Sequence, residues 1–101
     1  MEKSFSEFES ELRDQGFPTV LTREWAPHAV VDRHSHPFDA NALIVRGEMW
    51  LTVGETTRHL SRGDTFQIPA GAAHEERYGP EGATYWVGRR FPVPPRDDSS
   101  G

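Results

Sequence analysis

The start of the chain carries apolar residues at the spacing of one helical face. Phe5, Phe8 and Leu12 are separated by three and four positions, with charged residues between them, and this is the period of an amphipathic helix. Gly16 follows as a residue suited to ending a helix. We therefore predict a short helix within the segment 1–16, whose apolar face covers part of the core or a partner chain.

From Phe17 onward the pattern changes to short runs rich in β-branched and aromatic residues, interrupted by Gly or Pro. Such runs at regular intervals are typical of an all-β sandwich or barrel. The expected strands cover residues 19–25, 29–35, 40–46, 48–53, 56–60, 65–68, 74–78 and 83–90. A turn is expected between the last two, over Gly79 to Gly82. The β-domain thus spans 17–91, and the Pro-rich segment 92–101 is expected to be an extended or disordered tail.

Composition narrows the chemistry that one such domain can carry. The chain has 101 residues, which suffices for one compact domain and one modest core. It has no cysteine, so disulfides, thiolate metal sites and cysteine nucleophiles are excluded. A transition-metal site would have to use carboxylates and some of the five histidines.

The formal net charge of −5 is not spread evenly, because much of the acidic excess lies in the first 14 residues. No basic stripe that would bind nucleic acid is visible. The longest apolar run is Ala42–Val45, far below the roughly 20 residues that a membrane span needs. We expect a cytoplasmic protein that binds neither nucleic acid nor membrane and whose ligand is a small molecule.

Three of the histidines are placed so that they can converge. His34 and His36 are two positions apart in a predicted strand, so both side chains project from the same face. His74 opens another predicted strand, directly after a turn over 69–71. Spacing alone leaves metal ligation open against the alternative of a chance pair on a surface strand.

The residues around His74 fit a more specific pattern. Gly63, Pro69, Gly71 and His74 match G-x5-P-x-G-x2-H. Together with the His34-Ser35-His36 segment and Gly47, this pattern resembles the cupin superfamily, in particular the small single-domain, RmlC-like cupins. The resemblance implies a jelly-roll β-barrel, a metal bound by His34, His36 and His74, and a homodimer.

The match departs from the cupin pattern where a fourth ligand is expected. Ala40 stands where the pattern has Glu, and Tyr78 stands where it has Asn. Asp39 is a possible additional ligand if Pro37 introduces a bulge that turns it inward. If Asp39 does not bind, the site has three neutral imidazoles, a ligand set that suits Fe, Zn, Ni or Cu better than Mn, Ca or Mg.

Other polar residues fall in phase with the predicted ligands. Glu76 and Tyr78 share the strand face of His74, which makes Glu76 a candidate acid or base and Tyr78 a possible catalytic group. Their plainer interpretations are a surface glutamate and a core tyrosine. Asp32 shares the face of His34 and could orient that imidazole as an outer-sphere partner, unless it is solvated.

The sequence supports three hypotheses about function. The first is a metal-dependent enzyme acting on a small molecule, dioxygenase-like or isomerase-like, with His28 and His59 outside the site. The second is a stand-alone cupin that binds or senses a small molecule without turning it over. The third is a purely structural or storage barrel. This hypothesis does not explain why three polar histidines would lie in the barrel interior, where burying polar groups costs free energy.

Overall fold

Two long antiparallel strands, β3 and β6, organise the molecule. The structure is a computed structural model that describes residues 3–92. Over that range the elements are α1 (Phe5–Asp14), β1 (Thr19–Trp25), β2 (Val30–His34), β3 (Asp39–Val53), β4 (Thr56–Ser61), β5 (Thr65–Ile68) and β6 (His74–Arg90). The all-β jelly-roll class with a short N-terminal helix is confirmed. Most of the predicted tail, residues 93–101, lies outside the described residues.

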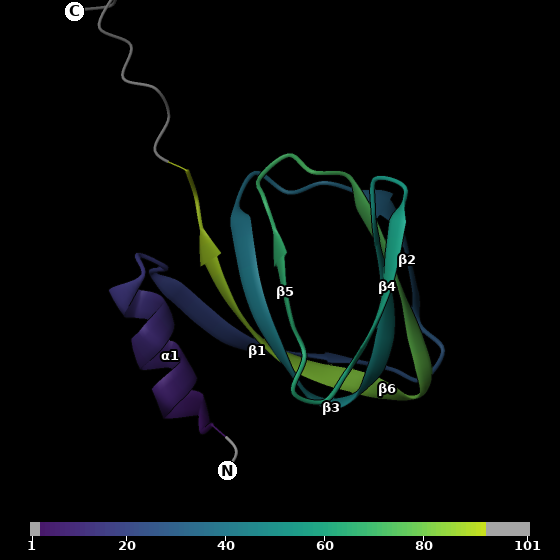
Figure 1. Cartoon of the computed structure of the whole chain (residues 1–101), viewed down its shortest axis with the longest axis horizontal. Helices are drawn as coiled ribbons and strands as arrows, with labels where there is room; N and C mark the ends of the chain where they lie inside the picture. Colours follow the sequence, from purple (N-terminus) through teal and green to yellow (C-terminus); the bar gives the residue numbers. More distant parts are fainter. Residues whose placement is uncertain (1–2, 93–101) are drawn as a thin grey trace, which may run out of the picture.

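Each long strand contributes to two sheets that face each other. The first half of β3 and the second half of β6 pair with each other and with β5 and β1. The second half of β3 and the first half of β6 pair with each other and with β4 and β2. Figure 1 shows the strands surrounding one interior, with α1 outside it. A barrel of this kind leaves one interior, into which alternate residues of every strand point.

The two long strands are continuous where the sequence predicted breaks. Pairing of β3 with β6 passes from Gly47 opposite Ala83 to Met49 opposite Tyr78, so residues 79–82 bulge out of a strand that continues beyond them. The sequence predicted that a turn over Gly79 to Gly82 separates two strands, and this prediction is wrong because the single strand β6 runs through the segment. A bulge inserts extra residues on one strand and bends it, which lets β6 pass from one sheet to the other.

Glycine is required at this bend because backbone segments meet there. Gly47 has φ +77°, and a Cβ added to it would lie 2.0 Å from the carbonyl oxygen of Gly82. Gly82 has φ +68°, and its added Cβ would lie 2.1 Å from the carbonyl oxygen of Trp25. No side chain fits between these atoms, so the bend of both sheets depends on two residues without a Cβ.

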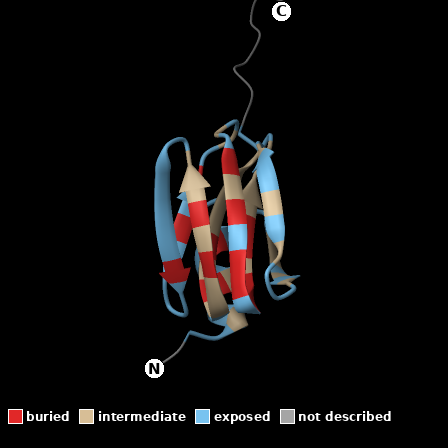
Figure 2. Cartoon of the chain, turned by 90° about the vertical axis from the view of Figure 1, so that its right-hand side faces the viewer, coloured by how far each residue is buried: buried red, intermediate tan, exposed pale blue. Residues whose placement is uncertain are grey.

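The hydrophobic core fills the barrel between the two sheets. Its buried residues are Ala42, Ile44, Met49, Leu51, Leu60, Phe66, Ile68, Tyr78, Ala83, Tyr85 and Val87. Figure 2 shows buried and more exposed positions alternating along the strands, as a half-buried sheet requires. The same alternation carries polar side chains inward at one end of the barrel, where His74 and Glu76 are also buried.

The N-terminal helix covers the outside of the first sheet. Ser4 caps α1 and forms a capping box with Glu7, which satisfies two backbone donors of the first turn. Phe8 and Leu12 pack with Phe17 into a second buried cluster against Val20, Leu43 and Trp86. The predicted apolar face is thus buried within the chain itself. Across residues 3–92, no helix is long and apolar enough to cross a membrane.

Candidate metal site

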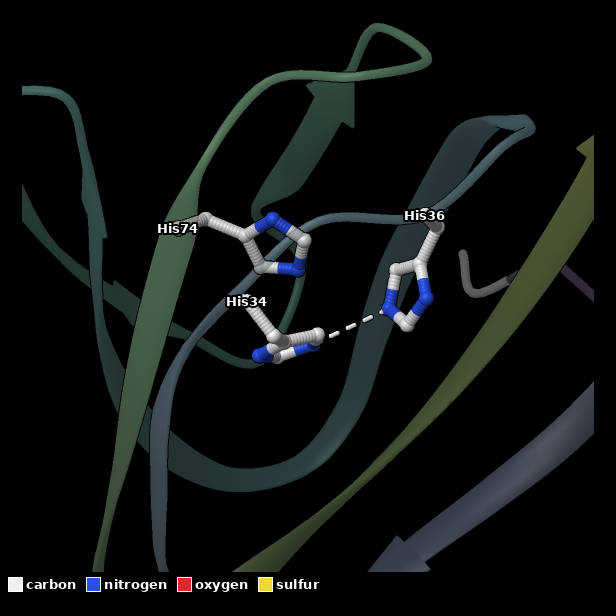
Figure 3. A group of neighbouring side chains, drawn as sticks. All are labelled: His34, His36 and His74. Atoms are coloured by element: carbon white, nitrogen blue, oxygen red, sulfur yellow. Dashed lines mark hydrogen bonds between the residues drawn. The ribbon is translucent and has the colours of Figure 1, made fainter.

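Three imidazoles converge inside one end of the barrel. His34 ends β2 and pairs in register with His74, which begins β6, and His36 follows in the connection to β3. Figure 3 shows the three rings turned toward one another. One ring nitrogen from each residue forms a group whose members all lie within 4.8 Å of one another. The convergence predicted from the His34–His36 spacing and the turn before His74 is present in the structure.

Backbone carbonyls fix the orientation of two of these rings. The Nδ1–H of His34 donates to the carbonyl of Asp32 at 2.7 Å, and that of His74 donates to the carbonyl of Ala72 at 3.0 Å. In a neutral imidazole a protonated Nδ1 leaves Nε2 as the acceptor. Both Nε2 lone pairs are therefore directed into the cluster, where that of His34 faces Nε2 of His36, and metal-binding histidines are commonly held in this way.

The spacing of the His34 and His36 ligand atoms fits a bound metal ion. Nε2 of His34 and Nε2 of His36 are 3.0 Å apart. Two nitrogens bound to one ion at about 2.0–2.1 Å would lie roughly 2.8–3.4 Å apart at octahedral or tetrahedral angles. Burial lowers the pKa of His36, and the neighbouring His34 and His74 lower it further. A neutral His36 is the form that can ligate a metal.

Neither aspartate named from the sequence points its carboxylate into this cluster. Asp32 does hold His34, but through its backbone carbonyl, while the residue itself is exposed. Asp39 accepts a hydrogen bond from the backbone N–H of Ala70 at 2.8 Å and pairs with Arg90 at 3.3 Å. The Ala70 contact above all lowers the pKa of Asp39. With both oxygens engaged elsewhere, Asp39 anchors the turn before His74 and stays out of the histidine group.

A carboxylate reaches the cluster from another strand. Ala40 faces the interior at the position where the cupin pattern has Glu, and Glu76 lines the same small cavity from β6. Glu76 is only 7% exposed, and its Oε2 lies 3.8 Å from Nε2 of His74 and 3.9 Å from Nε2 of His34. The structure thus places Glu76 where it can assist a bound cation or carry a proton beside it.

Tyr78 lies behind Glu76. Its hydroxyl donates a hydrogen bond to Oε1 of Glu76, and its ring stacks on Trp25 at 5.1 Å. Burial, followed by the nearby Tyr85 and Glu76, raises the pKa of Tyr78 far above its ordinary value. Tyr78 therefore stays protonated and acts here as a donor that positions the carboxylate.

Sequence reasoning missed three residues around the cavity: Phe38, Tyr85 and Arg89. Phe38 stacks on His36 with ring centroids 4.7 Å apart, and the guanidinium of Arg89 lies 4.8 Å from the centre of the Phe38 ring. Strand alternation held a signal for two of them, because Tyr85 and Arg89 are in phase with the core residue Val87. The cavity measures about 40 Å³, room for one or two water molecules.

The two remaining histidines lie elsewhere. His59 is paired with Glu48 at 2.7 Å and stacks on Trp50 with centroids 4.7 Å apart. His28 is exposed in the connection between β1 and β2, with φ +60°. Their separation from the cluster agrees with their assignment as residues outside the site.

The fold and the cluster together define a small antiparallel β-barrel with a candidate three-histidine metal site. A family model described as "Cupin domain" matches residues 21–86. That match covers most of the chain and all three clustered histidines, so the chain belongs to the cupin family. A search of curated proteins found no match.

Solved structures with the same fold come from several organisms. KdgF from Halomonas sp. is 24% identical with a TM-score of 0.61, over 79% of this chain and 71% of KdgF. An RmlC-like cupin from Shewanella frigidimarina is 22% identical with a TM-score of 0.64, over 80% of this chain and 69% of its own. A Bacillus subtilis oxalate decarboxylase is 19% identical with a TM-score of 0.66, over 71% of this chain and 20% of its own. At these identities the similarity supports the fold alone.

Proposed function

We propose that His34, His36 and His74 hold a divalent transition metal and that the resulting centre acts on a small molecule. The observation that carries the proposal is the orientation of the rings. The Nδ1 atoms of His34 and His74 are committed to backbone carbonyls, and one nitrogen from each of the three rings joins a group spanning 4.8 Å at most. The ligand set favours Fe, Zn, Ni or Cu, because imidazole nitrogen suits these ions.

The residues around the cluster supply the remaining chemistry. A bound metal of this kind polarises a substrate oxygen or activates O₂, which fits a dioxygenase-like or an isomerase-like reaction. Glu76 lies beside two of the ligand nitrogens and is held by Tyr78, so it is the group that would take or give a proton. The surrounding barrel core keeps bulk water from the inner side of the site.

A second function, binding without turnover, is favoured by the size of the cavity. At about 40 Å³ it holds one or two water molecules and no whole metabolite. A ligand would therefore approach from the open end of the barrel with only one group entering. Such an arrangement also serves a stand-alone sensing cupin.

The metal content of the purified protein tests the first step. Protein made without a histidine tag is expected to carry close to one equivalent of Fe, Zn, Ni or Cu by inductively coupled plasma mass spectrometry. His34→Ala should lose it, because two imidazoles remain. His59→Ala removes a histidine outside the cluster and should keep the metal. A metal-free parent after reconstitution, or equal metal content in the two variants, contradicts the proposal.

Turnover and binding are then separated on the metal-loaded protein. Small metabolites that raise the unfolding temperature are incubated with it, with and without O₂, and followed by mass spectrometry. Consumption of a stabilising compound by the parent but not by His34→Ala supports an enzyme. Stabilisation with no consumption under either condition supports the sensing function.

We also propose that the chain forms a homodimer. The apolar face of α1 is already covered by its own sheet, so the edge strand β2 is the surface that we assign to pairing, where Val30 is 67% exposed. Exposed strand edges readily pair with another chain. Sedimentation equilibrium should give twice the chain mass of 11.4 kDa, and Val30→Lys should give the single mass. A monomeric parent at all concentrations would rule out this assembly.

A further inference from the structure

Arg89 is a cation at the cavity for which residues 3–92 provide no counterion. It lies near the end of β6 and lines the cavity together with His36 and Glu76. Among the described residues, its Nε is the buried side-chain nitrogen or oxygen that has no hydrogen-bond partner. Its described contact is with the face of Phe38, at 4.8 Å from the ring centre. A buried donor without a partner costs folding free energy, so its presence needs an explanation.

Other arginines of the same barrel show what a satisfied guanidinium looks like here. Arg90, the next residue, pairs with Asp39 and donates to the carbonyl of Gln15. Arg33 pairs with Glu75 at 3.3 Å. Arg89 differs from these two arginines, because no described residue pairs with it and it lines the candidate site.

The charges around the cavity favour an anion. Three imidazoles contribute no charge when neutral, and Glu76 is the carboxylate among the cavity-lining residues. Arg89 offsets that charge. A divalent ion at the histidines would add two further positive charges, leaving an excess of positive charge that water alone does not neutralise.

We propose that Arg89 binds the carboxylate of a small organic acid and that this carboxylate is the one group of the ligand that enters the cavity beside the histidine site. A guanidinium presents a planar fork of donors that matches a carboxylate in two parallel hydrogen bonds. The neighbouring Phe38 offers an apolar face for a short carbon chain. This inference rests on the proposed metal site and specifies the chemical class of its substrate or ligand.

The test compares malonate with its uncharged analogue malonamide. Isothermal titration of metal-loaded parent protein should show binding of malonate and none of malonamide. Arg89→Gln should weaken malonate binding at least about tenfold. Arg89→Lys keeps the positive charge but loses the planar fork of donors, so its malonate affinity should lie between those of the parent and Arg89→Gln. Arg77→Gln is the matched control, because Arg77 is on the same strand and also lies over an aromatic ring, that of Trp50, but faces outward. It should bind malonate as the parent does.

Several outcomes would overturn the inference. These are equal malonate affinity for Arg89→Gln and the parent, binding of malonamide as tight as that of malonate, or a preference for inorganic phosphate over malonate. Unfolding midpoints measured without ligand show whether Arg89→Gln still folds, so that a loss of malonate binding is not mistaken for a loss of structure. The metal content of each variant distinguishes a failure of this inference from a failure of the proposed metal site. Arg89→Gln should keep the metal. If the parent itself proves to be metal-free, it can still be titrated with malonate.

Discussion

Gly47→Ala is expected to destabilise the folded barrel by about 2–5 kcal/mol. A left-handed backbone costs a residue with a Cβ about 1–2 kcal/mol, and forcing an extra carbon into a packed site typically costs 1–3 kcal/mol more. Here the added Cβ would lie 2.0 Å from the Gly82 carbonyl oxygen, and neither backbone segment can move without opening the β3–β6 pairing. Urea unfolding followed by circular dichroism measures the loss directly.

Gly54→Ala separates the two contributions to that loss. Gly54 also has a positive φ, of +62°, but no atom lies within 4 Å of its added Cβ. This variant should lose only the conformational part, about 1–2 kcal/mol. Similar losses in both variants would mean that the bend at Gly47 relaxes easily and that the close approach to Gly82 is not a constraint on the fold.

Glu76→Gln is expected to weaken metal binding about tenfold while leaving the metal-free protein at least as stable. Groups that support the ligands of a metal site typically contribute 10–100-fold to its affinity, and Glu76 lies 3.8 and 3.9 Å from two ligand nitrogens. Glutamine retains an acceptor for Tyr78 and avoids the cost of burying a charge. Metal competition with a chromophoric chelator and thermal unfolding of the metal-free protein measure the two effects.

Glu75→Gln provides the control for that experiment. Glu75 is the neighbouring residue, with its side chain 46% exposed and paired with Arg33 outside the barrel. It should change neither metal affinity nor stability appreciably, because exposed ion pairs contribute little. If Glu76→Gln holds the metal as tightly as Glu75→Gln, the Glu76 carboxylate takes no part in the site.

The sequence predicted most of the strands because their alternation and turn residues are local signals. It could not predict that β3 and β6 continue through their glycines. The tight contact of Gly47 with Gly82, and of Gly82 with Trp25, joins segments far apart in the chain, and only the assembled sheets show why a glycine lies at each place. Residues 79–82 were interpreted as a turn because a bulge and a turn use the same residue types.

The candidate metal site was also predictable where its signals are local in the sequence, and not where they depend on the packed structure. The His34–His36 spacing and the position of His74 after a turn indicated that the rings could converge, and the G-x5-P-x-G-x2-H pattern made that prediction specific. The phase of Glu76 and Tyr78 on β6 was inferred correctly. The role of Asp32 was not, because side-chain patterns do not reveal that a backbone carbonyl holds His34. Arg89 gave no signal beyond its phase, since its missing partner is a property of the packed interior.

The bulge at residues 79–82 also has a consequence for insertions and deletions in this chain. Before it, the inward residues of β6 are even-numbered, among them His74 and Glu76; after it they are odd-numbered, among them Tyr85 and Arg89. Side-chain direction alternates with every residue. The number of residues in the bulge therefore decides whether even-numbered or odd-numbered residues of β6 point inward after it. Losing or gaining one residue there would turn either the histidine or the arginine outward, even if the barrel still closed. The length of this segment is therefore constrained by what the cavity must contain.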